Sequence, residues 1–268
     1  MATYVFSDVH GHFRTLDRLL ERVSPSSEDR IYMLGDMIDR GPDPMSVVRM
    51  CHDLPNTCVL MGNHEDLMLS FYADPNDPLA RMNWEINGAG PTQDGLHALD
   101  ASERVELARW LFTLPLYATC EVDGQWYLLV HAGIDPRRVP EDMSGPWTEQ
   151  RLDDVVQNQY RDDLMWIRED FWGYPSGLVD EHGEGPIIIA GHTPTRYLDT
   201  MADRPDRLSS DENGLCRMVR VGACEKTGGV ADRWDIDCGC AGGYGFGQLL
   251  MLRLDDSEEI YEPVREGE

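Results

Sequence analysis

Five short apolar runs along the chain each lead into a cluster of polar residues. Their length and the glycines near them are typical of buried β-strands rather than of helices. Within two residues of the end of each run comes an aspartate, an asparagine or a histidine. The runs occupy residues 3–6, 31–34, 58–61, 126–130 and 187–190. The pattern predicts strands whose carboxyl ends all carry groups able to bind a metal ion.

Apolar residues that recur every three or four positions predict helices between the early strands. Pro44 suits the first turn of the second helix, and Ser102 is expected to cap the fourth. The predicted helices cover 12–23, 44–54, 63–72 and 102–114, while 148–171 is interpreted as one long helix or two short ones. Alternating strands and helices favour an α/β fold, in which ligands bind beyond the carboxyl ends of the strands.

The second half of the chain predicts mainly strands. Asp123-Gly124 is a good hairpin turn between strands at 117–122 and 125–130. Further strand candidates are 218–221, 233–236, 248–254 and, within a charged carboxyl-terminal tail, the short stretch 260–261. Since the polar strand ends must converge, we expect a single domain over 1–268, with a Pro-, Asn- and Gly-rich cap or insert at 74–100.

Charge restricts the partners of the chain. The formal net charge of −26 opposes binding to nucleic acid backbones and to anionic membrane surfaces. No apolar run approaches the roughly 20 residues of a membrane helix, and residues 1–6 lack the basic and apolar stretches of a secretory signal. A cytoplasmic location, without nucleic acid or membrane partners, is therefore expected, and the oligomeric state is left open.

Cysteine usage agrees with a reducing compartment. The seven cysteines are scattered and include no C-x-x-C pair, so a disulfide framework is not expected. One alternative to ordinary thiols is a zinc site that uses Cys216, Cys224, Cys238 and Cys240. Their spacing matches no zinc-finger pattern, which favours buried or free thiols.

The polar strand ends together meet the demands of phosphate ester hydrolysis. Water has to become a nucleophile at neutral pH and the phosphoryl charge has to be offset, and two metal ions ~3.5–4 Å apart do both. Asp8 and His10 can face one side of an extending strand end, while Asp36 can bridge two ions. The predicted metal ligands are Asp8, His10, Asp36, Asn63, His131 and His192.

This mixed set of oxygen and nitrogen donors suits manganese, iron, zinc or cobalt better than magnesium or calcium alone. Any single histidine has an alternative interpretation as an ordinary core or surface group. We assign that ordinary role to the histidines that do not follow a predicted strand, which are His12, His52, His97 and His182.

These clusters resemble the motifs of the phosphoprotein phosphatase family of calcineurin-like metallophosphoesterases, of the bacterial serine/threonine protein phosphatase type. The five family motifs occur in the family's order, as Asp8-Val9-His10-Gly11, Gly35-Asp36-Met37-Ile38-Asp39-Arg40-Gly41, Gly62-Asn63-His64-Glu65, His131-Ala132-Gly133 and Gly191-His192. The resemblance implies a fold of two mixed β-sheets packed as a sandwich and flanked by helices (αββα).

The resemblance also implies roles for residues beside the metal ligands. His64 would be the general acid that protonates the leaving oxygen, with Asp39 orienting its imidazole. Arg40 would bind phosphoryl oxygens through its planar guanidinium, beside Asn63. We expect Arg168 to be a second phosphate-binding arginine. The alternative for Arg168 is a surface arginine paired with an acidic neighbour, which contributes little.

By this resemblance the chain is a phosphomonoesterase with two divalent metal ions, for which manganese is the first expectation. A hydroxide that bridges the ions would attack phosphorus in line, with no phosphoenzyme. The implied substrate is a phosphorylated protein, with serine/threonine or dual specificity, or a small phosphoester.

Two alternatives remain for the function. The first is a symmetrical diadenosine tetraphosphatase, a close relative whose members tend to have alanine for the aspartate of the second motif and aspartate for the glutamate of the third. This chain keeps Asp39 and Glu65 and so departs from that pattern. The second is a non-catalytic scaffold, for which substituted metal ligands would be expected.

The insert at 74–100 has its own two interpretations. Arg81, Trp84 and Gln93 could frame a substrate groove. Alternatively, the insert is a variable cap packed on the surface.

Overall fold

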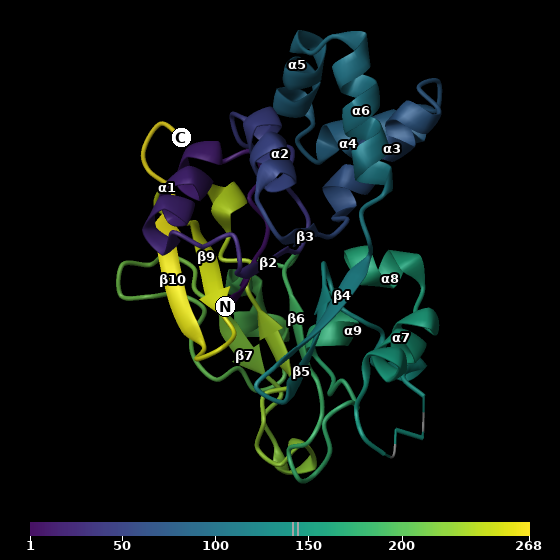
Figure 1. The fold of residues 1–268 in the computed structure, drawn as a ribbon, viewed down its shortest axis with the longest axis vertical. Coiled ribbons are helices and arrows are strands. Elements are labelled where there is room, and N and C mark those ends of the chain that lie inside the picture. Colours follow the sequence, from purple (N-terminus) through teal and green to yellow (C-terminus); the bar gives the residue numbers. More distant parts are fainter. Residues whose placement is uncertain (141, 144) are drawn as a thin grey trace.

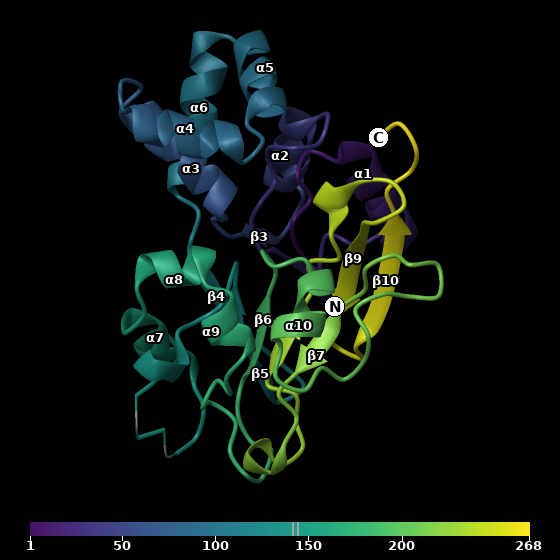
Figure 2. The ribbon, with the colours of Figure 1, turned by 180° about the vertical axis from the view of Figure 1, so that it is seen from behind.

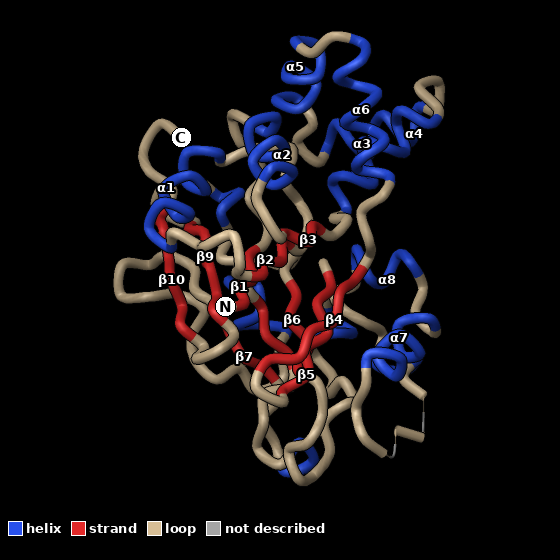
Figure 3. Tube along the Cα trace, viewed as in Figure 1, coloured by secondary structure: helices blue, strands red, loops and turns tan. Residues whose placement is uncertain are grey.

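The computed structural model describes residues 1–140, 142–143 and 145–268. Its strands are β1 (Thr3–Phe6), β2 (Arg30–Met33), β3 (Thr57–Val59), β4 (Tyr117–Val122), β5 (Gln125–Val130), β6 (Ile187–Ala190), β7 (Val219–Val221), β8 (Arg233–Asp235), β9 (Gln248–Arg253) and β10 (Glu258–Pro263). They form two five-stranded sheets, in the orders β10-β9-β1-β2-β3 and β4-β5-β6-β8-β7. Figure 3 shows the strands in red at the centre, with blue helices around them.

The helices are α1 (Phe13–Val23), α2 (Pro44–Asp53), α3 (Asn63–Ala73), α4 (Pro78–Ile86), α5 (Gly90–Ala98), α6 (Ala101–Phe112), α7 (Glu149–Gln157), α8 (Arg161–Trp166), α9 (Glu169–Trp172) and α10 (Leu198–Met201). Short 3₁₀ turns occupy Pro136–Arg138, Thr195–Tyr197, Glu225–Thr227 and Cys240–Gly242. None of the helices in the described part of the chain is long and apolar enough to cross a lipid bilayer.

Both sheets are mixed. In the first, β1, β2 and β3 are parallel, whereas β9 pairs antiparallel with β1 and β10 antiparallel with β9. In the second, β4 and β5 form the predicted hairpin around Asp123-Gly124, and β5, β6 and β8 are parallel, with β7 antiparallel at the edge. Parallel neighbours end at the same edge of a sheet, so the polar residues that follow them are brought together.

Alternating side chains divide the interior into three apolar layers. On β1, Val5 faces the layer between the sheets, whereas Phe6 joins the layer that includes Leu16 of α1. On β5, Leu129 joins the central layer, and Leu128 packs with residues of α7, α8 and α9. Figures 1 and 2 show α1 and α2 on one side of the sheets and α7 to α9 on the other. The expected αββα sandwich is confirmed.

Local sequence explains where two of the helices begin. The carboxylate of Asp43 accepts a backbone N–H of α2, and Pro44 occupies the first turn, where its missing N–H costs nothing. At α6 the carboxylate of Asp100 accepts the N–H groups of Ser102 and Glu103, and the Glu103 side chain bonds back. The cap of α6 is therefore Asp100, and the prediction of Ser102 is wrong.

Other boundaries also differ from the sequence-based expectations. The helix predicted over 148–171 is three helices, because the chain breaks at 158–160 and again at 167–168. Arg168 has φ −134° and ψ −88°, which no helix continues through, so this residue precedes α9. The insert at 74–100 contains α4 and α5, and the charged tail forms the strand β10 rather than the two residues 260–261.

Candidate metal centre and active site

The predicted metal ligands follow the ends of strands from both sheets. Asp8, His10, Asp36 and Asn63 come after β1, β2 and β3, whereas His131 and His192 come after β5 and β6. All six side chains are buried, at 5% exposure or less. The structure brings them together, because Asn63 from the first sheet contacts both histidines from the second.

The backbone at this site is strained. Positive φ angles, which residues other than glycine rarely adopt, occur at Asp8 (52°), His10 (45°), Asp36 (62°), Asp39 (69°), Arg40 (67°) and His192 (65°). Each such conformation costs about 1–3 kcal/mol and persists only where the surrounding structure holds it. The strain therefore falls on residues that the sequence marks for chemistry.

Two glycines allow the ligand-bearing loops to approach each other. A Cβ atom at Gly191 would collide with the carboxylate of Asp8, and one at Gly62 would collide with the backbone N and the carboxylate of Asp36. The backbone N–H of His192, next to Gly191, donates to the Asp8 carboxylate at 3.0 Å. Any side chain at either glycine would push two ligand loops apart.

Two buried groups of side chains could each hold a metal ion. One consists of His10, Asp36 and His64, and the other of Asp36, His131 and His192. Asp36 belongs to both: its Oδ2 lies 3.4 Å from Nε2 of His10, and its Oδ1 lies 3.5 Å from Nε2 of His131. The two oxygens of one carboxylate thus face the two groups, as the sequence-based bridging role requires.

Asp8 and Asn63 adjoin these groups. Oδ1 of Asp8 lies 4.0 Å from Nε2 of His10. Oδ1 of Asn63 lies 2.9 Å from Nε2 of His131 and 2.9 Å from Nδ1 of His192. The donor set of carboxylates, imidazoles and one amide oxygen fits a pair of divalent transition-metal ions.

Backbone carbonyl groups orient two of the imidazoles. Nδ1 of His10 lies 3.0 Å from the carbonyl oxygen of Ile38, and Nδ1 of His131 lies 2.8 Å from that of Leu34. Each carbonyl holds a proton on Nδ1 and so leaves Nε2 as the nitrogen with a free lone pair. In both residues Nε2 is the atom that faces Asp36.

The protonation states suit metal binding. Burial lowers the pKa of His10 and of His192 well below the ordinary 6.5, and that of His131 to about 3, so the imidazoles are neutral ligands at pH 7. Burial, together with neighbouring carboxylates, raises the pKa of Asp8 and of Asp36 well above its ordinary value. Cations bound here would displace those protons, which couples metal affinity to pH.

This coupling predicts an unusual pH dependence of stability for protein treated with a chelator. Above about pH 7.5, one unit over their ordinary pKa of 6.5, the histidines of the unfolded chain are mostly neutral, so the buried carboxylates dominate. Asp8 and Asp36 have a raised pKa in the folded state, and that of Glu65 is about 7. The folded protein then binds more protons than the unfolded chain, and stability falls as pH rises through these values.

We expect the Tm of chelator-treated protein to fall by about 2–4 °C or more between pH 7.5 and pH 9. A loss of about 1 kcal/mol in the free energy of unfolding lowers Tm by that much in a chain of 150–250 residues. Thermal unfolding with and without a chelator, at several pH values, measures this slope. Manganese-loaded protein is the control and should have a flatter profile. A Tm that rises with pH in the chelator-treated sample would contradict the prediction.

Asp39 and His64 form a buried pair beside the first group. Nδ1 of His64 lies 2.7 Å from Oδ2 of Asp39, and Nε2 lies 3.9 Å from Oδ2 of Asp36. Burial lowers the pKa of His64, and the hydrogen bond to Asp39 opposes that effect. Because Asp39 holds a proton on Nδ1, Nε2 is the nitrogen that can exchange a proton with a bound molecule.

Arg40 and Arg168 reach the centre from different loops. The Nη1 and Nη2 atoms of Arg40 lie 3.2 Å from Nε2 of His10 and 2.9 Å from Nε2 of His64. Nε of Arg168 donates to Nε2 of His192 at 3.1 Å. Arg168 thus lies at the centre rather than on a remote surface, and both guanidinium groups are suited to phosphoryl oxygens.

Glu65 fixes the loop that carries Asp36. Its carboxylate accepts hydrogen bonds from the backbone N–H groups of Asp36 (2.9 Å), Met37 (2.9 Å), Ile38 (3.3 Å) and Gly62 (3.0 Å). One side chain therefore ties the loop after β2 to the start of α3. Four donors on one buried carboxylate offset much of its desolvation.

Sequence reasoning missed Arg233, which holds α9, the short helix that follows Arg168. Arg233 is fully buried beside Asp232, with Nε 3.0 Å from that carboxylate. Its Nη1 donates to the carbonyl oxygens of Phe171 (2.7 Å) and Trp172 (3.0 Å). These bonds fix the end of α9, the helix that begins directly after Arg168. No motif marks Arg233, because its partners are backbone carbonyl groups distant in sequence.

Sequence reasoning also missed the partners of Asp39 in the insert. Trp84 is fully buried, and its Nε1 donates to Oδ2 of Asp39 at 3.1 Å. Thr92 donates from Oγ1 to Oδ1 of Asp39 at 2.6 Å. The prediction that Trp84 frames a groove is therefore wrong, because the indole is buried against Asp39, the hydrogen-bond partner of His64. Arg81 lies over the ring of Phe71, 5.3 Å from its centroid.

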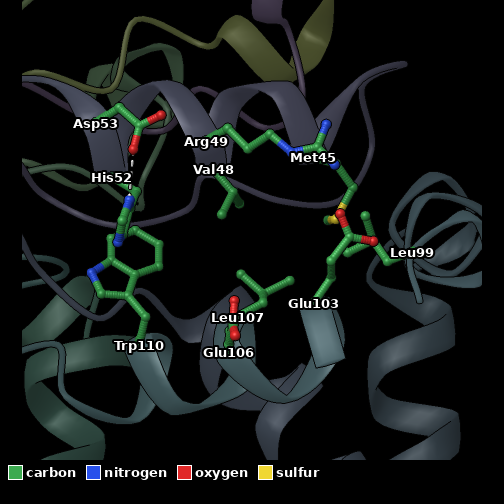
Figure 4. A pocket seen from close by; sticks show the side chains of 10 residues that line it. All are labelled: Met45, Val48, Arg49, His52, Asp53, Leu99, Glu103, Glu106, Leu107 and Trp110. Atoms are coloured by element: carbon green, nitrogen blue, oxygen red, sulfur yellow. Dashed lines mark hydrogen bonds and ion pairs between the residues drawn. The ribbon is translucent and has the colours of Figure 1, made fainter. Parts of the chain in front are cut away.

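A separate hollow lies between α2 and α6 (Figure 4). Val48, Leu107 and Trp110 line it together with the charged Arg49 and Glu103. The lining contains none of the predicted ligands, so this hollow is not part of the metal centre.

The cysteines do not form a second metal site. All seven are free thiols, and within the described residues the groups able to hold a metal contain none of them. Cys216, Cys238 and Cys240 are buried, and burial raises the pKa of each thiol. The cysteines are therefore interpreted as ordinary thiols rather than as zinc ligands.

Comparisons with known proteins agree on the type of protein. A family model described as calcineurin-like phosphoesterase matches residues 1–221. The symmetrical bis(5'-nucleosyl)-tetraphosphatase of Erwinia tasmaniensis is 35% identical over 297 residues, which cover 99% of this chain and 98% of that protein. The enzyme of the same name from Dechloromonas aromatica is 33% identical over 160 residues, which cover 59% of this chain and 49% of that protein.

A solved structure supports the fold. The metallophosphoesterase from Sphaerobacter thermophilus superposes with a TM-score of 0.52 at 15% sequence identity, and the match covers 99% of this chain and 88% of that one.

Proposed function

Because the chain belongs to the calcineurin-like phosphoesterase family and is a metal-dependent hydrolase of phosphoric ester or anhydride bonds, we propose that it cleaves dinucleoside tetraphosphates symmetrically. The observation that carries this proposal is the 35% identity to a tetraphosphatase over 99% of the chain. The dinucleotide substrate, first an alternative from the sequence motifs, thus takes precedence over the phosphorylated protein that those motifs favour.

The arrangement of charges supports an extended anionic substrate. Arg40 lies in the loop after β2 of the first sheet, and Arg168 lies between α8 and α9, which follow β5 of the second sheet. The two arginines can therefore bind phosphoryl groups on both sides of the bond that breaks. Divalent ions held by the two groups would lower the pKa of water and offset phosphoryl charge. We propose manganese as the first metal to test, with iron, zinc and cobalt next.

The protein's own residues supply orientation and a proton. The planar forks of Arg40 and Arg168 hold phosphoryl oxygens and so fix the phosphorus relative to the ligands. Nε2 of His64 gives its proton to the departing oxygen, while Nδ1 stays bonded to Asp39. The carboxylate stabilises the imidazolium before this transfer.

An exposed aromatic side chain beside the centre suits a nucleobase. Trp166 is 38% exposed, and its ring centroid lies 5.8 Å from that of His192. Stacking of a base on an aromatic ring is worth ~1–3 kcal/mol. We therefore expect Trp166→Ala to raise KM for diadenosine tetraphosphate about 5-fold or more, and to leave KM for phosphoserine unchanged.

Steady-state kinetics on both substrates check this prediction. Trp166→Phe keeps an aromatic face and should recover most of the affinity. Tyr160→Ala removes another exposed ring, which packs against Arg138, and is the matched control. An equal rise in KM for both substrates would contradict a base-stacking role.

Phosphoprotein hydrolysis is the second candidate, and one observation favours it. The leaving group of a phosphoanhydride is a weak base that needs little protonation, whereas a serine or threonine alkoxide needs a proton. The chain retains an intact pair of Asp39 and His64, 2.7 Å apart, which is the group that a poor leaving oxygen requires.

A direct comparison of substrates tests the proposal. Metal-stripped protein is reloaded with manganese and assayed on diadenosine tetraphosphate and on phosphoserine and phosphothreonine peptides, with the products identified by chromatography. We expect a higher kcat/KM for the dinucleotide and two nucleoside diphosphates as products. Turnover of the phosphopeptides alone would overturn the proposal, and an Asp36→Asn preparation controls for contaminating phosphatases.

A further inference from the structure

The insert at 74–100 reaches beneath the catalytic pair, through the carboxylate of Asp39. That carboxylate is fully buried. Oδ1 accepts from the Thr92 hydroxyl at 2.6 Å, Oδ2 faces Nδ1 of His64 at 2.7 Å, and the Trp84 indole N–H lies 3.1–3.2 Å from both oxygens. Two of the three side chains that fix Asp39 thus come from the insert.

Thr92 and Trp84 are themselves rigidly held. The hydroxyl of Thr92 donates to the Asp39 side chain and accepts the Asp39 backbone N–H at 2.9 Å, so its own orientation is fixed. Trp84 is fully buried against Phe71, with ring centroids 5.3 Å apart. Neither donor can turn away without leaving a buried polar group unpaired, which costs about 1–3 kcal/mol.

The same insert also holds the neighbouring arginine. The backbone N–H of Arg40 donates to the carbonyl oxygen of Gly88 at 3.0 Å. A Cβ atom at Gly88 would lie 2.9 Å from Cγ of Arg40, so the turn between α4 and α5 packs closely against this side chain. Two consecutive residues of the site, Asp39 and Arg40, therefore depend on one inserted segment for their position.

We propose that Thr92 and Trp84 are positioning residues for proton transfer: they lock the Asp39 carboxylate so that it holds His64 in line with the departing oxygen. The inference rests on the proposed function only in that the chain must hydrolyse some phosphoester. It assigns the insert a part in the chemistry rather than the role of a surface cap.

These two residues can position His64 because the Asp39 carboxylate has partners on both of its oxygens. A carboxylate with one fixed partner can rotate about its Cβ–Cγ bond, whereas one with partners on both oxygens cannot. The 2.7 Å bond to Nδ1 then sets both the plane of the His64 ring and the direction of Nε2. Small misplacements of a catalytic group cost large factors in rate.

The test uses two aryl phosphates of similar size that differ in leaving group. Phenol is a poor leaving group and needs the acid, whereas 4-nitrophenol leaves with little help. In manganese-loaded Thr92→Val we expect kcat for phenyl phosphate to fall about 10- to 100-fold, a part of the 10²–10⁴ that a general acid supplies. The kcat for 4-nitrophenyl phosphate should stay within about 3-fold, and both KM values should be unchanged.

Three further variants sharpen the test. Thr92→Ser restores the hydroxyl and should rescue kcat on phenyl phosphate. Trp84→Phe keeps the aromatic packing, removes the indole N–H and should reproduce the selective loss. Thr113→Val removes an exposed hydroxyl at the end of α6, outside the insert, and should leave both rates unchanged. Tm and metal content, measured for each, keep a folding defect separate.

A combination with His64→Asn distinguishes positioning from a general structural effect. If Thr92 acts through His64, Thr92→Val adds no further loss on phenyl phosphate in the His64→Asn background. Equal losses on both aryl phosphates, or a multiplied loss in the double variant, would overturn the inference and leave the proposed function intact. A wild-type protein that cleaves aryl phosphates but no dinucleotide would overturn the proposed function and leave this inference intact.

Discussion

Replacement of Asp36 by asparagine is expected to cost metal occupancy, with loss of at least the ion beside His10, and to lower turnover by roughly 10³-fold or more. Oδ2 of Asp36 lies 3.4 Å from Nε2 of His10, Oδ1 lies 3.5 Å from Nε2 of His131, and Oδ1 also accepts the backbone N–H of His64 at 3.0 Å. The amide oxygen will take the Oδ1 position to keep that bond. The amide NH₂ then faces His10, where it cannot bind a cation.

The magnitude follows from what the ions contribute. A metal ion that polarises a phosphoryl oxygen supplies several kcal/mol of transition-state stabilisation, and each 1.36 kcal/mol is about tenfold in rate. Elemental analysis of dialysed protein, together with kcat on an aryl phosphate, measures both effects. Asp94→Asn changes an exposed carboxylate of α5 and is the matched control. Two retained metal ions in Asp36→Asn would show that this carboxylate does not bridge them.

Replacement of His64 by asparagine has a different expected signature. Metal content should stay near normal, while kcat on a substrate with a poor leaving group falls by about 10²–10⁴-fold. The reason is that His64 is held by Asp39 through Nδ1 and offers Nε2 for proton transfer. The loss should be much smaller on 4-nitrophenyl phosphate, whose leaving group needs little protonation.

Metal analysis of the His64 variant also decides between two roles for this residue. The side chain belongs to one of the groups able to hold a metal, together with His10 and Asp36. If His64→Asn lost metal ions, it would be a ligand and not an acid. His97→Asn, an exposed histidine of α5, is the matched control and should leave both metal content and rate unchanged.

The strands and the positions of the ligands were predictable because both follow from local pattern. A short apolar run flanked by glycine favours a buried strand because it is too short for a typical helix, and the residue that follows it then lies at the edge of the sheet. That argument singles out Asp8, Asp36 and His131 from the sequence alone, and the fold brings them within reach of one another. The hairpin around Asp123-Gly124 was equally local, since two residues define the turn.

The remaining parts depend on contacts between distant segments. Trp84 and Thr92 carry no pattern that distinguishes them from core residues, and they acquire a role only because α4 and α5 fold back beneath Asp39. The end of α9 has the same origin: Arg233, far along the chain, binds the carbonyl groups of Phe171 and Trp172. The periodicity of apolar residues along the sequence cannot reveal partners that are distant in the chain.

The choice of substrate also lay beyond the motifs. The metal ligands are common to enzymes that act on quite different phosphoesters, so function has to be argued from the groups around them. Asp39 and Glu65 favoured a protein phosphatase, whereas similarity along the whole chain favours a tetraphosphatase. Both residues have structural explanations here, since Glu65 ties the Asp36 loop to α3 and Asp39 is held by the insert.

The pairing of β1 with β9 has a consequence for biosynthesis. The strand that leads into Asp8 is hydrogen-bonded to β2 on one side, but its other neighbour ends at Arg253, and Thr3 is further tied to Asp255, 252 residues away. During translation β1 therefore keeps one open strand edge until β9 has left the ribosome. Pairing of strands so distant in sequence is slow. A messenger truncated before β9 would therefore yield an inactive product prone to aggregation through the unpaired edge of β1.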